Sequence, residues 1–119
     1  MDEIIRFVME ITVVEIKTQK DFDDFKKVTE LLNLNFVVGK KYSLEELKNL
    51  LAVTNQRPPV DENDTLCFAF NYYKGFSMDW KHNFVKEIND GYYSNFIGVE
   101  SLKADLQTLL NKIKGELFS

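Results

Sequence analysis

The residues able to do acid–base or metal chemistry are few and isolated in this sequence. His82 is the only histidine and Cys67 the only cysteine among 119 residues. A cysteine or serine nucleophile is usually activated by a neighbouring histidine, and a structural zinc ion needs several Cys or His ligands. On a helix over residues 79–90, His82 would point about 160° away from the apolar stripe. We therefore predict a surface imidazole and a buried structural thiol, with no catalytic group, no cofactor and no metal site.

Recognition of phosphate is also unsupported by the sequence. The five glycines are scattered and form neither GxGxxG nor GxxxxGK[ST]. Thirteen of the fifteen basic residues are lysines, and the net charge is −4. Arginine is the preferred fork for phosphates and base edges, so an acidic, arginine-poor chain lacks the usual features of a nucleic-acid binder. We expect no direct contact with nucleic acid.

The segment over residues 54–65 is the one loop with a strong composition. Pro58 and Pro59 disfavour helix and remove two backbone donors. Three acids follow, Asp61, Glu62 and Asp64, and no basic residue lies between Pro58 and Tyr73. An uncompensated charge on a stiff turn would steer a basic partner. The alternative is an ordinary solvated loop.

Two adjacent tyrosine pairs stand out in the second half of the chain. They are Tyr72-Tyr73 and Tyr92-Tyr93. Neighbours on a strand point to opposite faces of the sheet, so one member of each pair is expected to lie outside the main core. Tyrosine is enriched at interfaces. We therefore predict a partner-binding surface of tyrosines beside the acidic loop; the alternative is packing that covers both faces.

Hydrophobic periodicity and capping signals predict the elements that position these residues. Thr18 is a candidate N-cap, Ser43 with Glu46 forms a capping box, and residues 66–73 alternate between apolar faces. Strands are predicted over residues 8–17, 36–38, 66–73 and 92–99, and helices over 19–33, 44–53, 79–90 and 101–117.

Two of these helices carry clear apolar stripes. The helix over 79–90 aligns Trp80, Phe84 and Ile88 and is expected to stop at Gly91. The last helix, with Ser101 as its expected cap, has the most regular stripe. Its members are Leu102, Leu106, Leu109, Leu110, Ile113 and Leu117.

These elements predict an α+β fold, a small sandwich of one mixed sheet of three to four strands with about four helices packed on it. The length predicts a single domain over residues 1–119, and 45% hydrophobic with 29% charged residues is typical of a globular protein. No apolar run approaches the length of a membrane span. One cysteine and an acidic N-terminus without a basic leader favour a reducing cytoplasm.

The function favoured by these features is that of a non-catalytic protein-binding module. We expect a small acidic inhibitor of a basic or nucleic-acid-handling protein, of the toxin-immunity or phage anti-defence type, acting as a monomer or homodimer. One alternative is a small-molecule-binding domain or small enzyme with a pocket between sheet and helix, using Tyr72, Tyr92, Asp79 and His82. A second is a degenerate winged helix built on helices 19–33 and 44–53. A third is a structural subunit that dimerises through helix 101–117.

Overall fold

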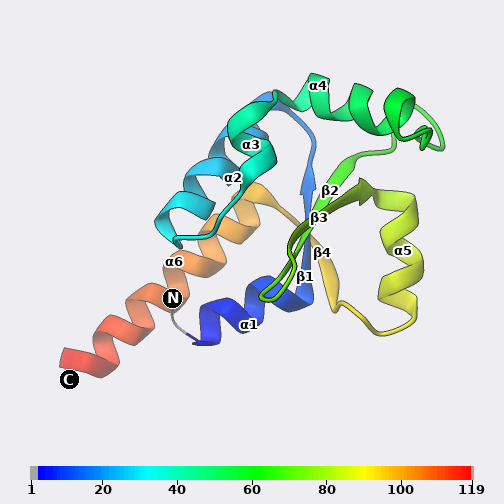
Figure 1. The fold of residues 1–119 in the computed structure, drawn as a ribbon. Coiled ribbons are helices and arrows are strands. Elements are labelled where there is room, and N and C mark those ends of the chain that lie inside the picture. Colours follow the sequence, from blue (N-terminus) through cyan, green and yellow to red (C-terminus); the bar gives the residue numbers. More distant parts are fainter. Residues whose placement is uncertain (1–2, 119) are drawn as a thin grey trace.

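A four-stranded mixed sheet organises the chain (Figure 1). The structure, a computed structural model, describes the backbone of residues 3–118 and the side chains of these residues other than 4 and 113–118. In chain order the elements are α1 (Glu3–Ile11), β1 (Thr12–Ile16), α2 (Gln19–Leu31), α3 (Val37–Lys41), α4 (Leu44–Asn49), the π-helical segment η1 (Leu50–Thr54), β2 (Leu66–Asn71), β3 (Gly75–Trp80), α5 (Lys81–Asn89), β4 (Asn95–Gly98) and α6 (Val99–Phe118).

The strand order across the sheet is β3-β2-β1-β4. β2 pairs antiparallel with both β1 and β3, whereas β4 runs parallel to β1. The predicted α+β fold with one mixed sheet is thus confirmed. Six α-helices occur within residues 3–118, against the four or so expected from the sequence.

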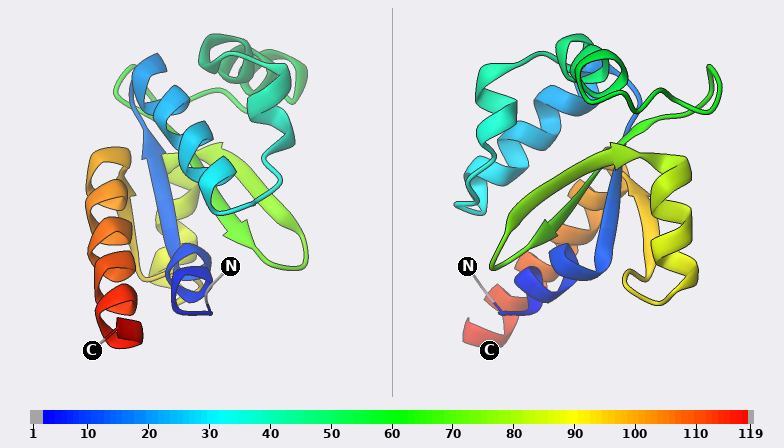
Figure 2. Two further views of the ribbon diagram at one scale, coloured as in Figure 1. Left: turned by 90° about the vertical axis from the view of Figure 1, so that its left-hand side faces the viewer. Right: turned by 45° about the vertical axis from the view of Figure 1, so that its right-hand side comes forward.

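The two faces of the sheet are covered unequally (Figure 2). One face packs against α1, α2, α4 and α6 and forms the main core, in which Phe36 and Phe68 meet edge to face at 4.9 Å. The other face is covered by α5, with Phe84 packed on Val13 and Cys67. This two-sided burial explains why β2 is buried from Leu66 to Phe70 although its faces alternate as predicted.

The first strand is shorter than the sequence indicated. Residues 8–11 belong to α1, and β1 begins at Thr12. Ile5 and Met9, one helical turn apart, enter the main core. The prediction of a strand from Val8 was wrong because a continuous apolar run hides the change from a helical period to a strand period.

The expected strand over residues 36–38 is also wrong. Residues 37–41 form α3, and the buried Phe36 precedes it. Thus α3 separates α2 from α4, and the two do not form the helix-turn-helix that the winged-helix alternative requires. Both α2 and α4, by contrast, start as predicted, at the Thr18 cap and the Ser43–Glu46 capping box.

A strand that the sequence analysis missed follows β2. The three-residue turn after Asn71 leads to Gly75, whose φ of +82° is the left-handed conformation that glycine adopts most readily, and β3 continues to Trp80. Trp80 therefore lies at the end of a strand and packs into the main core, apart from Phe84 on the opposite face. The helix begins at Lys81, later than predicted, and Gly91 follows its end at φ +87° as expected.

The C-terminal helix starts directly after a short strand. β4 covers Asn95–Gly98 and α6 begins at Val99, so Ser101 is not its cap. Leu102 and Leu106 are core residues, whereas the side chains of Ile113 and Leu117 lie outside the described residues. Between residues 3 and 118, no helix combines the length and apolar content needed to cross a bilayer.

Candidate protein-binding site

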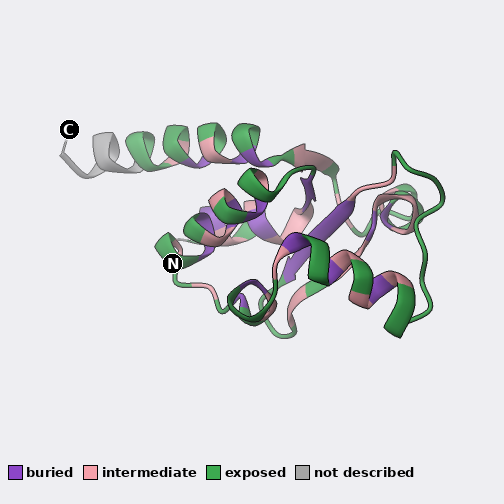
Figure 3. Cartoon of the chain, turned by 90° about the horizontal axis from the view of Figure 1, so that it is seen from above, coloured by how far each residue is buried: buried purple, intermediate pink, exposed green. Residues whose placement is uncertain are grey.

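The acidic loop, residues 55–65, leaves η1 and returns to β2, and it is exposed along most of its length (Figure 3). Its first end is held through Arg57. The indole Nε1 of Trp80 donates to the Arg57 carbonyl at 2.6 Å, and the Arg57 amide donates to Leu51 O at 3.0 Å. The Arg57 guanidinium also lies 3.4 Å from the carboxylate of Asp79. Backbone and side chain together attach this end to the edge strand β3.

The second end of the acidic loop is held by Asp64. Its carboxylate accepts hydrogen bonds from Val60 N at 2.9 Å, from His82 N at 3.3 Å and from the imidazole Nδ1 of His82. The Asp64 side chain is only 2% exposed. Because the N-cap residue of α5, Trp80, makes no side-chain cap, Asp64 supplies the missing acceptor from a distant part of the chain.

Asp64 is ionised in this environment. Its burial opposes the charged form, but hydrogen bonds from Val60 N and from the ring and backbone of His82 outweigh that effect and hold the pKa of Asp64 below its ordinary value. The expectation of three uncompensated carboxylates is therefore corrected: Asp64 is buried and paired. His82, expected to face solvent, is the half-buried partner in this pair.

The tip of the acidic loop presents apolar and acidic side chains together. Val60 is 66% exposed, and Asp61 and Glu62 beside it are exposed as well. Asp61 Oδ1 accepts the Asn63 amide at 2.8 Å, which shapes the turn and leaves the second carboxylate oxygen to solvent. The two remaining acids of the predicted site are thus presented on a constrained loop.

A hollow of about 310 Å³ lies between this loop and α4. Pro59, Ala52 and Trp80 contribute apolar surface to its lining. Its charged lining residues are Glu45, Lys48, Asp61, Glu62 and the buried Asp64. The acids outnumber the one lysine, so the hollow favours a cation.

The tyrosines do not lie beside the acidic loop, which corrects the predicted single surface. Tyr72 and Tyr73 are in the turn after β2, with their rings edge to face at 5.3 Å. The acidic loop precedes β2, and a six-residue strand spans about 20 Å. Tyr92 is exposed, while Tyr93 is half-buried against Phe84 at 6.0 Å, where burial and Glu87 raise the pKa of Tyr93.

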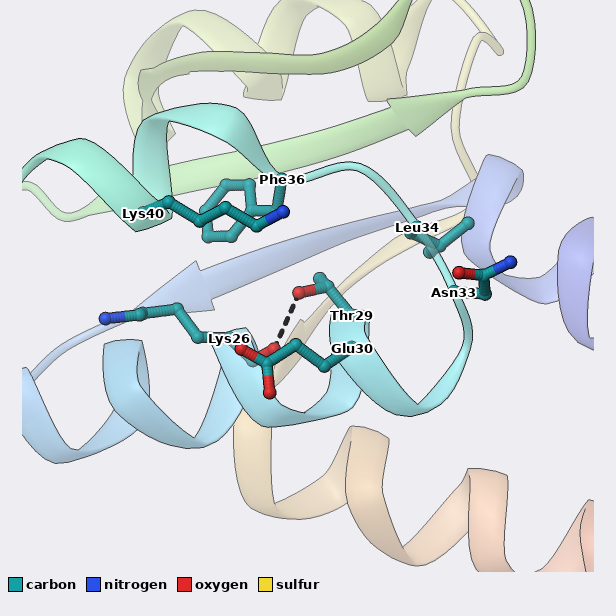
Figure 4. A pocket seen from close by; sticks show the side chains of 7 residues that line it. All are labelled: Lys26, Thr29, Glu30, Asn33, Leu34, Phe36 and Lys40. Carbon is teal, nitrogen blue, oxygen red and sulfur yellow. Dashed lines mark hydrogen bonds between the residues drawn. The ribbon is translucent and has the colours of Figure 1, made fainter.

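The groups of the alternative catalytic pocket also fail to converge. Asp79 is engaged by Trp80 N, Asn83 Nδ2 and Arg57, and Tyr72 lies at the far end of the sheet. A smaller cavity of about 170 Å³ between α2 and α3 is shown in Figure 4. It has Lys26, Lys40 and Glu30 in its lining, and its Thr29 hydroxyl already donates to Lys26 O at 2.7 Å. Among the described residues no three His, Cys, Asp or Glu side chains form a metal-binding group.

The thiol of Cys67 is fully buried on the α5 face of the sheet. Burial raises the pKa of Cys67 to about 12. We predict that the native protein does not react with a thiol reagent at mildly alkaline pH, while the urea-unfolded chain reacts stoichiometrically. The absorbance of the chromophore that the reagent releases measures the reaction of the native and of the unfolded protein. Rapid reaction of the native protein would contradict the buried position of Cys67.

Comparisons with protein-family models, with curated proteins and with solved structures find no match to this chain. The candidate site therefore rests on its own geometry. Sequence reasoning located Asp61 and Glu62, but it missed the anchors formed by Trp80, Arg57 and His82. No local pattern signals the side-chain contacts among them, since Trp80 bonds Arg57 from 23 positions away and His82 bonds Asp64 from 18 positions away.

Proposed function

We propose that this chain is a non-catalytic protein-binding module that captures a basic partner through the tip of its acidic loop. The class of activity that fits is stoichiometric inhibition of a basic or nucleic-acid-handling protein, of the toxin-immunity or phage anti-defence type. The observation that carries the proposal is the exposure of Val60, Asp61 and Glu62 on a loop anchored at both ends. The proposal places the protein in a reducing cytoplasm, in keeping with its single cysteine.

The anchors support binding because they reduce the entropy lost when the loop is ordered against a partner. A loop that is already constrained loses less conformational freedom on association than a mobile one. An apolar centre with a charged rim is also the usual anatomy of a protein interface. Val60 supplies apolar surface here, and Asp61 and Glu62 supply the charge.

The hollow beside the loop supports a basic side chain as the element recognised. Lysine and arginine have apolar stems with a charged end, which suits a lining of Pro59 and Trp80 edged by Glu45 and Glu62. Complementary charge mainly accelerates association, and that acceleration weakens as salt screens the field.

Neutralising the tip tests this proposal. The partner is first isolated by affinity capture from a lysate of the source cell and identified by mass spectrometry. For the Asp61→Asn/Glu62→Gln double variant we predict an association rate constant lowered about tenfold at low salt, with a smaller difference at high salt. Surface plasmon resonance at several ionic strengths measures both effects.

A matched control variant distinguishes the effect of the loop carboxylates from the effect of a changed net charge. Asp105→Asn/Glu87→Gln also removes two exposed carboxylates, from α6 and α5. This control is expected to retain nearly the wild-type association rate. Equal rates for the loop double variant and the wild type at low salt would refute the role of the loop.

A further inference from the structure

Exposed aromatic side chains gather at the end of the sheet opposite the acidic loop. Phe7 on α1 is 61% exposed, and Tyr72 and Tyr73 in the β2–β3 turn are 52% and 86% exposed. Because β1 and β2 are antiparallel, this turn lies beside α1, which ends where β1 begins (Figure 1). Three large rings are therefore left to solvent in one region.

Direct contacts join the turn to α1. The Arg6 guanidinium lies 3.7 Å from the ring centroid of Tyr72, and the Tyr72 amide donates to Glu10 Oε1 at 2.9 Å. Helical spacing places Glu3, Arg6, Phe7 and Glu10 on one face of α1, away from the buried Ile5 and Met9. We call the resulting surface the hairpin–α1 patch; it consists of Glu3, Arg6, Phe7, Tyr72, Tyr73 and Lys74.

The charges around these rings balance one another. Arg6 and Lys74 are positive, while Glu3 and the neighbouring Glu10 are negative. The tip of the acidic loop, in contrast, carries only negative charges, those of Asp61 and Glu62. A two-fold interface needs a surface that complements itself, so that each residue and its counterpart exchange roles across the axis. A rim that carries both positive and negative side chains around an aromatic centre can place each cation opposite an anion of the second copy, which meets that requirement. Tyr, Phe and Arg are also residues enriched in interfaces.

We infer that a second copy of this chain occupies the hairpin–α1 patch and forms a two-fold dimer. The inference does not depend on the proposed function, because the patch and the acidic loop lie at opposite ends of β2. Helix α6, the dimer seam of the third alternative considered from the sequence, is less suited, since Leu102 and Leu106 are already inside the core. The dimer would leave both acidic loops free to bind.

Sedimentation equilibrium tests this inference. The average mass of the wild type should rise from 13.9 kDa toward twice that value between low-micromolar and near-millimolar concentration. Tyr73→Asp and Phe7→Asp, both at exposed positions, should weaken dimerisation at least about tenfold, while circular dichroism remains that of the folded protein. Tyr92→Asp is the matched control, because Tyr92 is 73% exposed but follows α5 on the other face of the sheet. A wild type that stays at 13.9 kDa, or a Tyr73→Asp variant that dimerises normally, would overturn the inference.

Charge reversal tests the self-complementarity itself. Lys74→Glu makes the rim acidic and Glu3→Lys makes it basic, so each variant alone should lose the dimer. An equimolar mixture of the two should recover it as a heterodimer, detectable by native mass spectrometry. Absence of recovery would contradict a two-fold contact through these residues. The Asp61→Asn/Glu62→Gln variant should dimerise like the wild type, which keeps this test separate from that of the proposed function.

Discussion

Replacing Asp64 by asparagine is expected to lower the free energy of unfolding by about 3 kcal/mol. The substitution keeps the shape of the side chain but removes the negative charge of the carboxylate. That carboxylate accepts hydrogen bonds from Val60 N, from His82 N and from the His82 ring. The side chain is almost fully buried, so water cannot replace the lost interaction. The N-terminus of α5 also loses a favourable anion.

Urea denaturation at neutral pH, followed by circular dichroism, measures this loss. Asp61→Asn is the matched control three residues away, and its exposed carboxylate should change stability by no more than about 0.5 kcal/mol. If Asp64→Asn were as stable as the control, the anchoring of the acidic loop by Asp64 would be disproved.

The pH dependence of stability follows from the same contact. The folded-state pKa of Asp64 lies below its ordinary value of 3.8, so its stabilisation is fully present above that value and is lost as the pH falls through the lower folded-state pKa. Asp64→Asn should therefore show a shallower loss of stability below about pH 4 than the wild type. A residual acid slope will remain, because Glu15, although burial opposes its charge, also has a lowered pKa from Thr65 and Lys81.

Substitution of Gly39 by alanine is expected to destabilise the protein by about 1–3 kcal/mol. In a typical helix the same change is stabilising, because alanine is the better helix former. Here an added Cβ would lie 2.4 Å and 2.5 Å from two ring carbons of Phe36 and 3.1 Å from Lys26 Cγ. Phe36 is buried among Phe22, Phe25, Phe68 and Phe76, so its ring has no room to move.

Thermal and urea unfolding of Gly39→Ala measure this effect. Gly98→Ala is the control, because a Cβ there meets no atom within 4 Å, and it should be close to neutral. In a Phe36→Leu background the cost of Gly39→Ala should fall, since the smaller side chain relieves the overlap. A stabilised Gly39→Ala protein would show that α3 does not approach Phe36 this closely.

Local sequence signals located much of the secondary structure correctly. Thr18 caps α2, Ser43 and Glu46 form the capping box of α4, and Gly91 follows α5 as expected. The alternation in residues 66–71 separates the two faces of β2. Each of these signals depends on residues within one or two turns of each other, and neighbouring side chains and backbone dihedrals determine them directly.

Short apolar segments were assigned less well. The α1–β1 boundary lies in a near-continuous apolar stretch, and α3 and β3 have only five and six residues, too few for helical and strand periods to be distinguished. Trp80 illustrates the problem, because its spacing from Phe84 and Ile88 fits a helix, yet it ends a strand and packs on the opposite face of the sheet. Tertiary packing, rather than the local spacing of apolar residues, determines that Trp80 belongs to a strand.

The sequence by itself determined the acidic character of the chain, the α+β class and the presence of Asp61 and Glu62 on a proline-containing loop. The tertiary structure alone decided that Asp64 is withdrawn into a pair with His82 and that the tyrosines lie at the far end of β2 from the acids. The physical reason is that charge and turn propensity belong to individual residues and their neighbours. Which carboxylate is buried depends instead on a donor brought from 18 residues away by the β2–β3 hairpin.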